Sequence, residues 1–130
     1  MKTLAPFVCL LAILVAAPSC VLVVGAGLGA GAMYALGEDS IELYTEHSLD
    51  SVYSAAQLHF EDVGEVKVEE MGVKEAYIAA RVDDTDIDVY LTGVTDNTTR
   101  MVVKARKWRS TAPDLDMAQE IADRIAYRAK

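Results

Sequence analysis

The feature that most constrains this chain is an N-terminal stretch without charge. From Thr3 to Gly37 there is no Asp, Glu, Lys or Arg, and all 20 acidic residues lie at or beyond Glu38. A composition break of this kind separates two regions that meet different solvents, because charged side chains are costly in an apolar medium. With 130 residues in total, the chain has room for a single folded domain after this stretch.

The uncharged stretch has the parts of an export signal. Lys2 supplies a positive n-region, residues 4–17 form an apolar h-region, and a run of small residues ends at Ser19. Cys20 comes next, which predicts a lipoprotein signal peptide over residues 1–19 and a lipid on the new N-terminal cysteine. Two or three acyl chains anchor a protein stably, so a processed Cys20 would tether the chain to a membrane.

The residues beside the cysteine bear on this prediction in two ways. Ala17, Pro18 and Ser19 precede it, whereas a lipobox usually has Leu followed by two small residues. An ordinary signal peptide or an uncleaved anchor, with Cys20 incidental, therefore remains an alternative. Val21 rather than Asp follows Cys20, which favours the outer over the inner membrane of a Gram-negative bacterium.

A glycine-rich run from Val21 to Gly31 allows three interpretations. Gly25, Gly27 and Ala30 match the G-x-G-x-x-A fingerprint of dinucleotide-binding folds, but that fingerprint needs parallel βαβ units, which the rest of the chain does not predict. The run also contains G-x-x-x-G spacings, which promote helix association in lipid if residues 10–36 span a bilayer uncleaved. We favour a flexible tether over residues 20–37.

Residues 38–130 alternate in the manner of a small α+β domain. Apolar residues recur with period two in five segments and with helical spacing in two, and turn or capping residues separate these segments. The order β-α-β-β-β-β-α predicts an antiparallel sheet of about five strands with two helices on one face. The expected strands are 40–46, 66–69, 75–82, 86–92 and 100–106, and the expected helices are 49–63, between Ser48 and Gly64, and 111–125, with Thr111 and Asp114 at capping-box spacing.

The distribution of charge and reactive residues excludes several classes of function. The net charge of −8 argues against a nucleic acid partner. Cys9 and Cys20 both lie in the N-terminal segment, so the domain has no cysteine for a disulfide or a metal. His47 and His59 have no partners at metal or triad spacing and are expected at the surface. We therefore expect no catalytic residues, cofactor or metal site.

An acidic run on one strand invites a calcium interpretation. Asp84, Asp86 and Asp88 have D-x-D-x-D spacing, but the glycine and glutamate that an EF-hand loop requires are missing. The alternation favours a solvated face instead. If the following hairpin pairs Asp88 with Lys104 and Asp86 with Arg106, these are cross-strand ion pairs.

Aromatic and basic residues share the predicted solvent face of the sheet. Aromatic side chains with Arg are typical of protein-binding surfaces, although exposed strands also carry such pairs for local packing. The candidate partner-binding residues are Tyr44, Tyr77, Arg81, Tyr90, Lys104 and Arg106, to which Trp108 could add.

Four motifs occur together along the chain: the Ser19-Cys20 end of the leader, the Gly25–Gly31 run with Tyr34, the Glu42–Tyr44 strand that leads into Ser48–Tyr53, and the Asn97–Arg100 turn. With these motifs, the whole chain resembles a family of short bacterial lipoproteins classed as domain of unknown function 3568. The resemblance implies a secreted lipoprotein with a small α+β domain and implies no activity.

These features together predict a non-enzymatic lipoprotein of the cell envelope that faces the periplasm. It would be bound to the membrane through Cys20 and would act as a structural or protein-binding adaptor. The main alternative is a single-span membrane protein that self-associates through its glycine-rich segment. Binding of a small apolar ligand between the sheet and the long helix is a third hypothesis, and it requires a cavity there.

Overall fold

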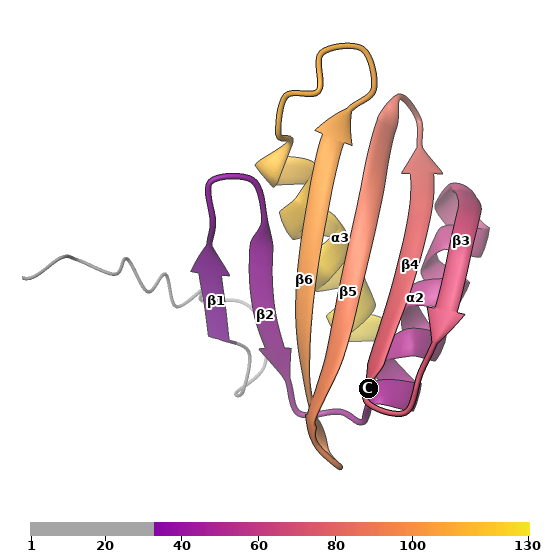
Figure 1. Cartoon of the computed structure of the whole chain (residues 1–130), viewed down its shortest axis with the longest axis vertical. Helices are drawn as coiled ribbons and strands as arrows, with labels where there is room; N and C mark the ends of the chain where they lie inside the picture. The colour runs from indigo at the N-terminus through magenta and orange to yellow at the C-terminus, as the bar shows by residue number, and fades with distance from the viewer. Residues whose placement is uncertain (1–32) are drawn as a thin grey trace, which may run out of the picture.

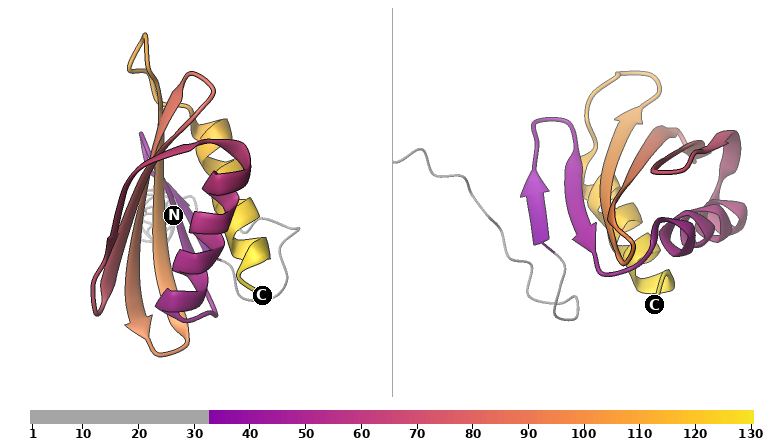
Figure 2. Two further views of the ribbon diagram at one scale, coloured as in Figure 1. Left: turned by 90° about the vertical axis from the view of Figure 1, so that its right-hand side faces the viewer. Right: turned by 60° about the horizontal axis from the view of Figure 1, so that its bottom comes forward.

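The computed structural model describes residues 33–130, which form one sheet with two helices on the same face (Figures 1 and 2). The sheet has six strands in the order β1-β2-β6-β5-β4-β3, and every neighbouring pair is antiparallel. In chain order the elements are β1 Met33–Leu36, β2 Ile41–Thr45, α2 Leu49–Val63, β3 Glu65–Met71, β4 Glu75–Val82, β5 Thr85–Thr95, β6 Thr98–Lys107 and α3 Leu115–Arg128.

From β2 onward the element order is the predicted β-α-β-β-β-β-α, and the antiparallel α+β fold is confirmed. The short strand β1 is additional and lies within residues 20–37, the range predicted as a flexible tether. It pairs with β2 through a tight turn in which the Gly37 N–H donates to the Ser40 carbonyl at 2.8 Å. Its four residues are uniformly apolar in type, so no alternation distinguishes them from the uncharged stretch before them.

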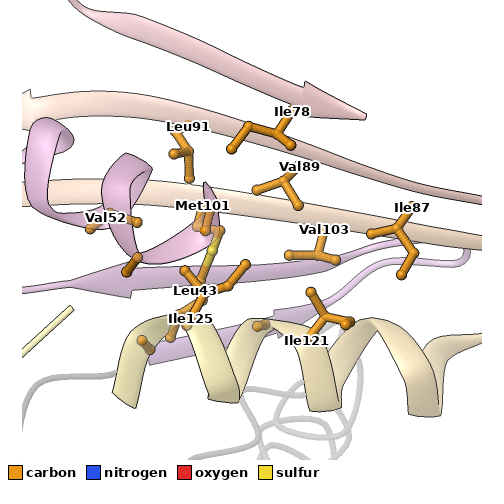
Figure 3. Packing of buried hydrophobic residues seen from close by; sticks show 14 of the residues in the cluster. Leu43, Val52, Ile78, Ile87, Val89, Leu91, Met101, Val103, Ile121 and Ile125 are labelled. Atoms are coloured by element: carbon orange, nitrogen blue, oxygen red, sulfur yellow. The ribbon is translucent and has the colours of Figure 1, made fainter. Parts of the chain in front are cut away.

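Alternation along the central strands decides which face the helices cover. The burial patterns of β2, β4, β5 and β6 each switch between buried and partly exposed at every residue through most of their length. The buried positions pack against α2 and α3 (Figure 3). The fully buried side chains at this interface include Ile41, Leu43, Val52, Phe60, Ile78, Val89, Leu91, Met101, Val103 and Ile125. Because these side chains occupy the space between sheet and helices, the apolar-ligand hypothesis gains no support.

Helix α2 begins and ends as the sequence predicts. The Ser48 hydroxyl accepts a hydrogen bond from the Ser51 N–H, and the Gly64 N–H donates to the Phe60 carbonyl at 2.9 Å. Helical spacing also predicts an apolar stripe on this helix that starts at Leu49 and ends at Val63, and the stripe is wrong at its C-terminal end, where Val63 is exposed. Phe60 in the same turn is fully buried, whereas Val63 lines a hollow beside α3 together with Tyr127 and Arg128.

Helix α3 begins three residues later than the capping-box spacing predicted. Asp114 is the N-cap and accepts a hydrogen bond from the Met117 N–H at 3.1 Å. Thr111 has φ 52°, in the left-handed region, and belongs to the loop before the helix. The expected cap at Thr111 is therefore wrong, because either Thr or Asp can cap a helix and the sequence does not say which of them does so here.

Strand β3 carries a bulge that the alternation did not reveal. The pairing with β4 shifts between Val66 and Val68, which leaves Lys67 as the extra residue. Val66 faces the helices, but Val68 pairs with Ala79 and is exposed on the other face. Strict alternation along the expected strand 66–69 predicts that both valines share one face, and that prediction is wrong.

In the part of the chain that the structure describes, no helix is both long and apolar enough to cross a bilayer. Cys20 and the glycine-rich run lie outside the described residues.

Candidate functional site

The face of the sheet without helices holds all six candidate partner-binding residues. Each alternates with neighbours that are buried against the helices, so its side chain points the other way. Backbone register places Tyr77 directly opposite Tyr90, but Tyr44 lies opposite Arg100, two strands away from Tyr90. The uncovered face therefore contains one tyrosine pair and one separate tyrosine.

In the Tyr77–Tyr90 pair, the Tyr77 ring is fixed by a hydrogen bond from its hydroxyl. The two ring centroids are 5.0 Å apart, with the rings tilted by 33°. The Tyr77 hydroxyl donates a hydrogen bond of 2.6 Å to the Asp88 carboxylate, and this bond raises the pKa of Tyr77 far above its usual value, with burial adding to the effect. Tyr90 is 44% exposed and presents the accessible part of the pair. Anchoring one ring lowers the entropic cost of using the pair as a contact surface.

The acidic strand uses different ion-pair partners from those predicted. The expected register is correct, since Asp86 lies opposite Arg106 and Asp88 opposite Lys104. However, the Asp86 carboxylate accepts two hydrogen bonds from Arg81 on the other neighbouring strand, β4, at 2.8 and 3.1 Å. The Asp88 carboxylate accepts a hydrogen bond from the Tyr77 hydroxyl. The Arg81 guanidinium, aided by Lys67, holds the pKa of the Asp86 carboxyl below its usual value.

Lys104 and Arg106 instead form ion pairs with Asp39, in the loop between β1 and β2. Arg106 donates to the Asp39 carboxylate at 2.6 Å, and the Lys104 ammonium lies 3.8 Å from the same carboxylate. Asp39 precedes β2 and is brought beside β6 by strand pairing, a contact that is distant in sequence. The basic residues of the predicted patch are thus neutralised by carboxylates of the same chain.

A further bidentate pair joins β6 to β2 and is not predicted by the sequence. Arg100 donates to both oxygens of Glu42, at 2.6 and 2.9 Å, and lowers the pKa of that carboxyl. Both residues alternate outward on adjacent strands, but β2 and β6 are separated by 58 positions at this contact, and no local signal gives that pairing.

Trp108 stands at the end of β6 and is largely exposed. The Arg81 guanidinium lies 5.1 Å from the centre of its indole ring, a cation–π contact, and the Trp108 N–H of the backbone donates to the Asp84 carbonyl at 2.8 Å. The end of β6 lies opposite to the β3–β4 turn (Figure 1). Trp108 follows this end and contacts Arg81, so it extends the uncovered face there.

A groove of about 490 Å³ lies on the same face beside that turn. Tyr77 and Tyr90 form one part of its wall, and Glu70 and Glu75 contribute carboxylates. This volume is within the range of ligand sites, which runs from about 300 to 1,000 Å³. The remaining lining residues are Met71, Gly72, Ala76, Leu91 and Thr92.

His59 is buried, which corrects the expectation that it lies at the surface. It is 8% exposed in the interface between α2 and α3, and its Nε2 has no hydrogen-bond partner within the described residues. The assignment to the exposed face failed because α3 packs over the side of α2 that the sheet leaves free. Burial lowers the pKa of His59, and Arg128 and Arg124 on α3 lower it further, opposed by Asp62 and Glu120.

This lowered pKa predicts that the domain loses stability as the pH falls. The unfolded chain binds a proton at His59 below its ordinary pKa of 6.5, whereas the folded chain resists protonation. The contribution of His59 to the free energy of unfolding is fully present above pH 6.5 and is lost as the pH falls toward the pKa of His59 in the folded state.

Urea unfolding of the wild type and of His59→Gln at pH 7.5 and 5.5 measures this effect. We expect the free energy of unfolding to fall more in the wild type than in the variant. His47→Gln is the control and should lose as much as the wild type; equal losses in all three proteins would contradict the prediction.

Among residues 33–130, no three His, Cys, Asp or Glu side chains cluster in a way that could hold a metal ion. The sheet they form is antiparallel throughout and does not supply the parallel βαβ unit that a dinucleotide fingerprint requires.

Comparison with known proteins places the chain in a family without assigning a role. No curated protein matches it. The family described as "Protein of unknown function (DUF3568)" matches residues 3–128, which include the uncharged N-terminal segment as well as the folded domain. The extent of this match, together with the fold that follows the segment, shows that the chain belongs to the DUF3568 family.

Proposed function

We propose that this protein is a non-enzymatic lipoprotein of the Gram-negative cell envelope, tethered through a lipid on Cys20, that binds a protein partner on the uncovered face of its sheet. The observation that carries the proposal is the Tyr77–Tyr90 pair, exposed on a face whose nearby arginines are already paired with carboxylates. The domain would then stand on the periplasmic side, with the outer membrane favoured by Val21 after Cys20.

The paired charges support this role because they prepare the face for contact. Binding costs free energy when polar groups lose water and flexible side chains become ordered. On this face Arg81, Arg100 and Arg106 already donate to carboxylates, so a partner does not need to supply new ones. Tyrosine has only two side-chain torsions and contributes large contact area at low entropic cost.

The anchor is tested by metabolic labelling with radioactive palmitate. We expect label in the wild type, none in Cys20→Ala, and full label in Cys9→Ala, because Cys9 would leave with the signal peptide. Absence of label in the wild type, or its loss in Cys9→Ala, would contradict the lipid on Cys20. An unlabelled, full-length protein that forms dimers in the membrane would support the single-span alternative.

The partner-binding face is tested by photocrosslinking in intact cells. A benzophenone amino acid at position 90 should give a discrete adduct of higher mass than the protein. The same amino acid at position 127 is the control, because Tyr127 is 70% exposed but lies on α3, on the covered side. No adduct at position 90, or the same adducts from both positions, would rule out the adaptor role of this face.

A further inference from the structure

Carboxylates on the uncovered face differ in their partners, and Asp88 accepts its hydrogen bond from the Tyr77 hydroxyl rather than from a cation. Asp39, Glu42 and Asp86 each pair with a basic side chain of the same chain. Glu70 and Glu75, beside the β3–β4 turn, have no such partner in the part of the chain described here. The negative charge of the face is therefore left uncompensated at one end.

These two glutamates line the groove that also exposes the tyrosine pair. Register places Glu70, Tyr77 and Tyr90 in one row across β3, β4 and β5. Glu75 lies in the next row, opposite Thr92. The residues between the rows, among them Ala76 and Leu91, turn their side chains to the covered face, so their backbone forms the floor.

Among the residues that the structure describes, none supplies a cation to the groove. Neither Lys nor Arg is among its lining residues, and Lys74, the closest in sequence, lines a different hollow together with Val73 and Gly93. An anionic ligand would be repelled by both glutamates. A bare metal ion is also disfavoured, because the described residues provide no cluster of three metal-binding side chains.

Resting on the adaptor function above, we infer that this groove binds an arginine or lysine side chain from a basic, extended segment of the partner protein. The aromatic faces of Tyr90 and Tyr77 attract a cation, and the carboxylates of Glu70 and Glu75 supply the opposite charge. A volume of about 490 Å³ accommodates such a side chain with its neighbours. Because β3 is an edge strand, an extended segment can reach the groove from the side of the sheet.

The test uses a synthetic peptide, acetyl-Gly-Arg-Gly-Arg-Gly-amide, and the full ¹⁵N-labelled chain in micelles of a non-ionic detergent. We expect amide shifts to change at residues 70–77 and 90–92. The double variant Glu70→Gln/Glu75→Gln should bind the peptide about 5- to 10-fold more weakly. Tyr90→Leu should also weaken binding. The peptide with Gln in place of both arginines should produce no shifts.

A matched variant separates the groove from general attraction to an acidic protein. Glu46→Gln/Glu61→Gln removes the same charge from exposed positions outside the groove and should leave the affinity within about 2-fold of the wild type. Equal weakening in both double variants, shifts confined to other surfaces, or equal binding of the Gln peptide would overturn the inference.

The outcomes also distinguish this inference from the adaptor proposal. If position 90 crosslinks to a protein in cells, but Glu70→Gln/Glu75→Gln binds the arginine peptide as the wild type does, the adaptor role stands and the cationic partner is wrong. If the glutamate variant weakens the peptide but no adduct forms in cells, the groove binds cations as inferred and the adaptor role is wrong.

Discussion

Phe60→Ala should lower the free energy of unfolding by about 3–5 kcal/mol, the usual cost of truncating a buried aromatic side chain. Phe60 is the largest of the fully buried side chains and lies in the last third of α2. Its removal leaves a cavity that the surrounding β-branched and small side chains fill only in part. The free energy of unfolding of a small domain is only about 5–15 kcal/mol, so this loss is a large share of it.

Chemical unfolding of the full chain, followed by circular dichroism, measures the effect. Leu58→Ala provides the comparison on the same helix, because Leu58 is 53% exposed and its truncation should cost less than about 1 kcal/mol. If the two variants unfold at the same denaturant concentration, the placement of Phe60 in the core is incorrect.

Gly64→Ala should destabilise the domain by about 1–3 kcal/mol for a steric reason. A Cβ at this position would meet the Arg81 carbonyl oxygen at 2.5 Å and Val82 Cγ2 at 2.9 Å. The carbonyl belongs to the backbone of β4, so relief requires the strand or the end of α2 to move. With φ −153° the residue has extended backbone, and the glycine is needed for space rather than for a left-handed conformation.

Gly93→Ala is the matched control for this substitution. The nearest atoms to its added Cβ are 3.7 Å away, an ordinary contact, and its φ lies outside the left-handed region. Alanine has less conformational freedom than glycine in the unfolded chain. The substitution should therefore leave the free energy of unfolding unchanged or raise it by up to about 1 kcal/mol. Equal destabilisation by both substitutions would show that the close contact at Gly64 is not the cause.

The elements of this domain were predictable because local patterns determine them. Ile87, Val89 and Leu91 alternate with polar residues, and any pairing that buries them must turn Asp86, Asp88 and Tyr90 outward. The hairpin register followed from the same parity, and for this reason Asp86 was correctly placed opposite Arg106. The pairing of Tyr77 with Tyr90 follows from two consecutive strands joined by a short turn.

Local patterns do not predict which of two neighbouring side chains a residue contacts, which helix face a second helix covers, or where a strand carries a bulge. Asp86 lies between Arg81 and Arg106 on the two neighbouring strands, and only side-chain geometry selects Arg81. His59 falls on the side of α2 away from the sheet, and only the position of α3 makes that side buried. The bulge at Lys67 has no residue signature and reverses the face of Val68.

By itself, the sequence determined the element order from β2 onward and the face that each central strand presents to the helices. These follow from hydrophobic periodicity and charge, which act over a few neighbouring residues. The tertiary structure decided which charges neutralise each other, because β2 meets β6 across more than fifty positions. Within residues 33–130, Glu70 and Glu75 have no ion-pair partner beside the tyrosines, and this charge is what points to a cationic partner.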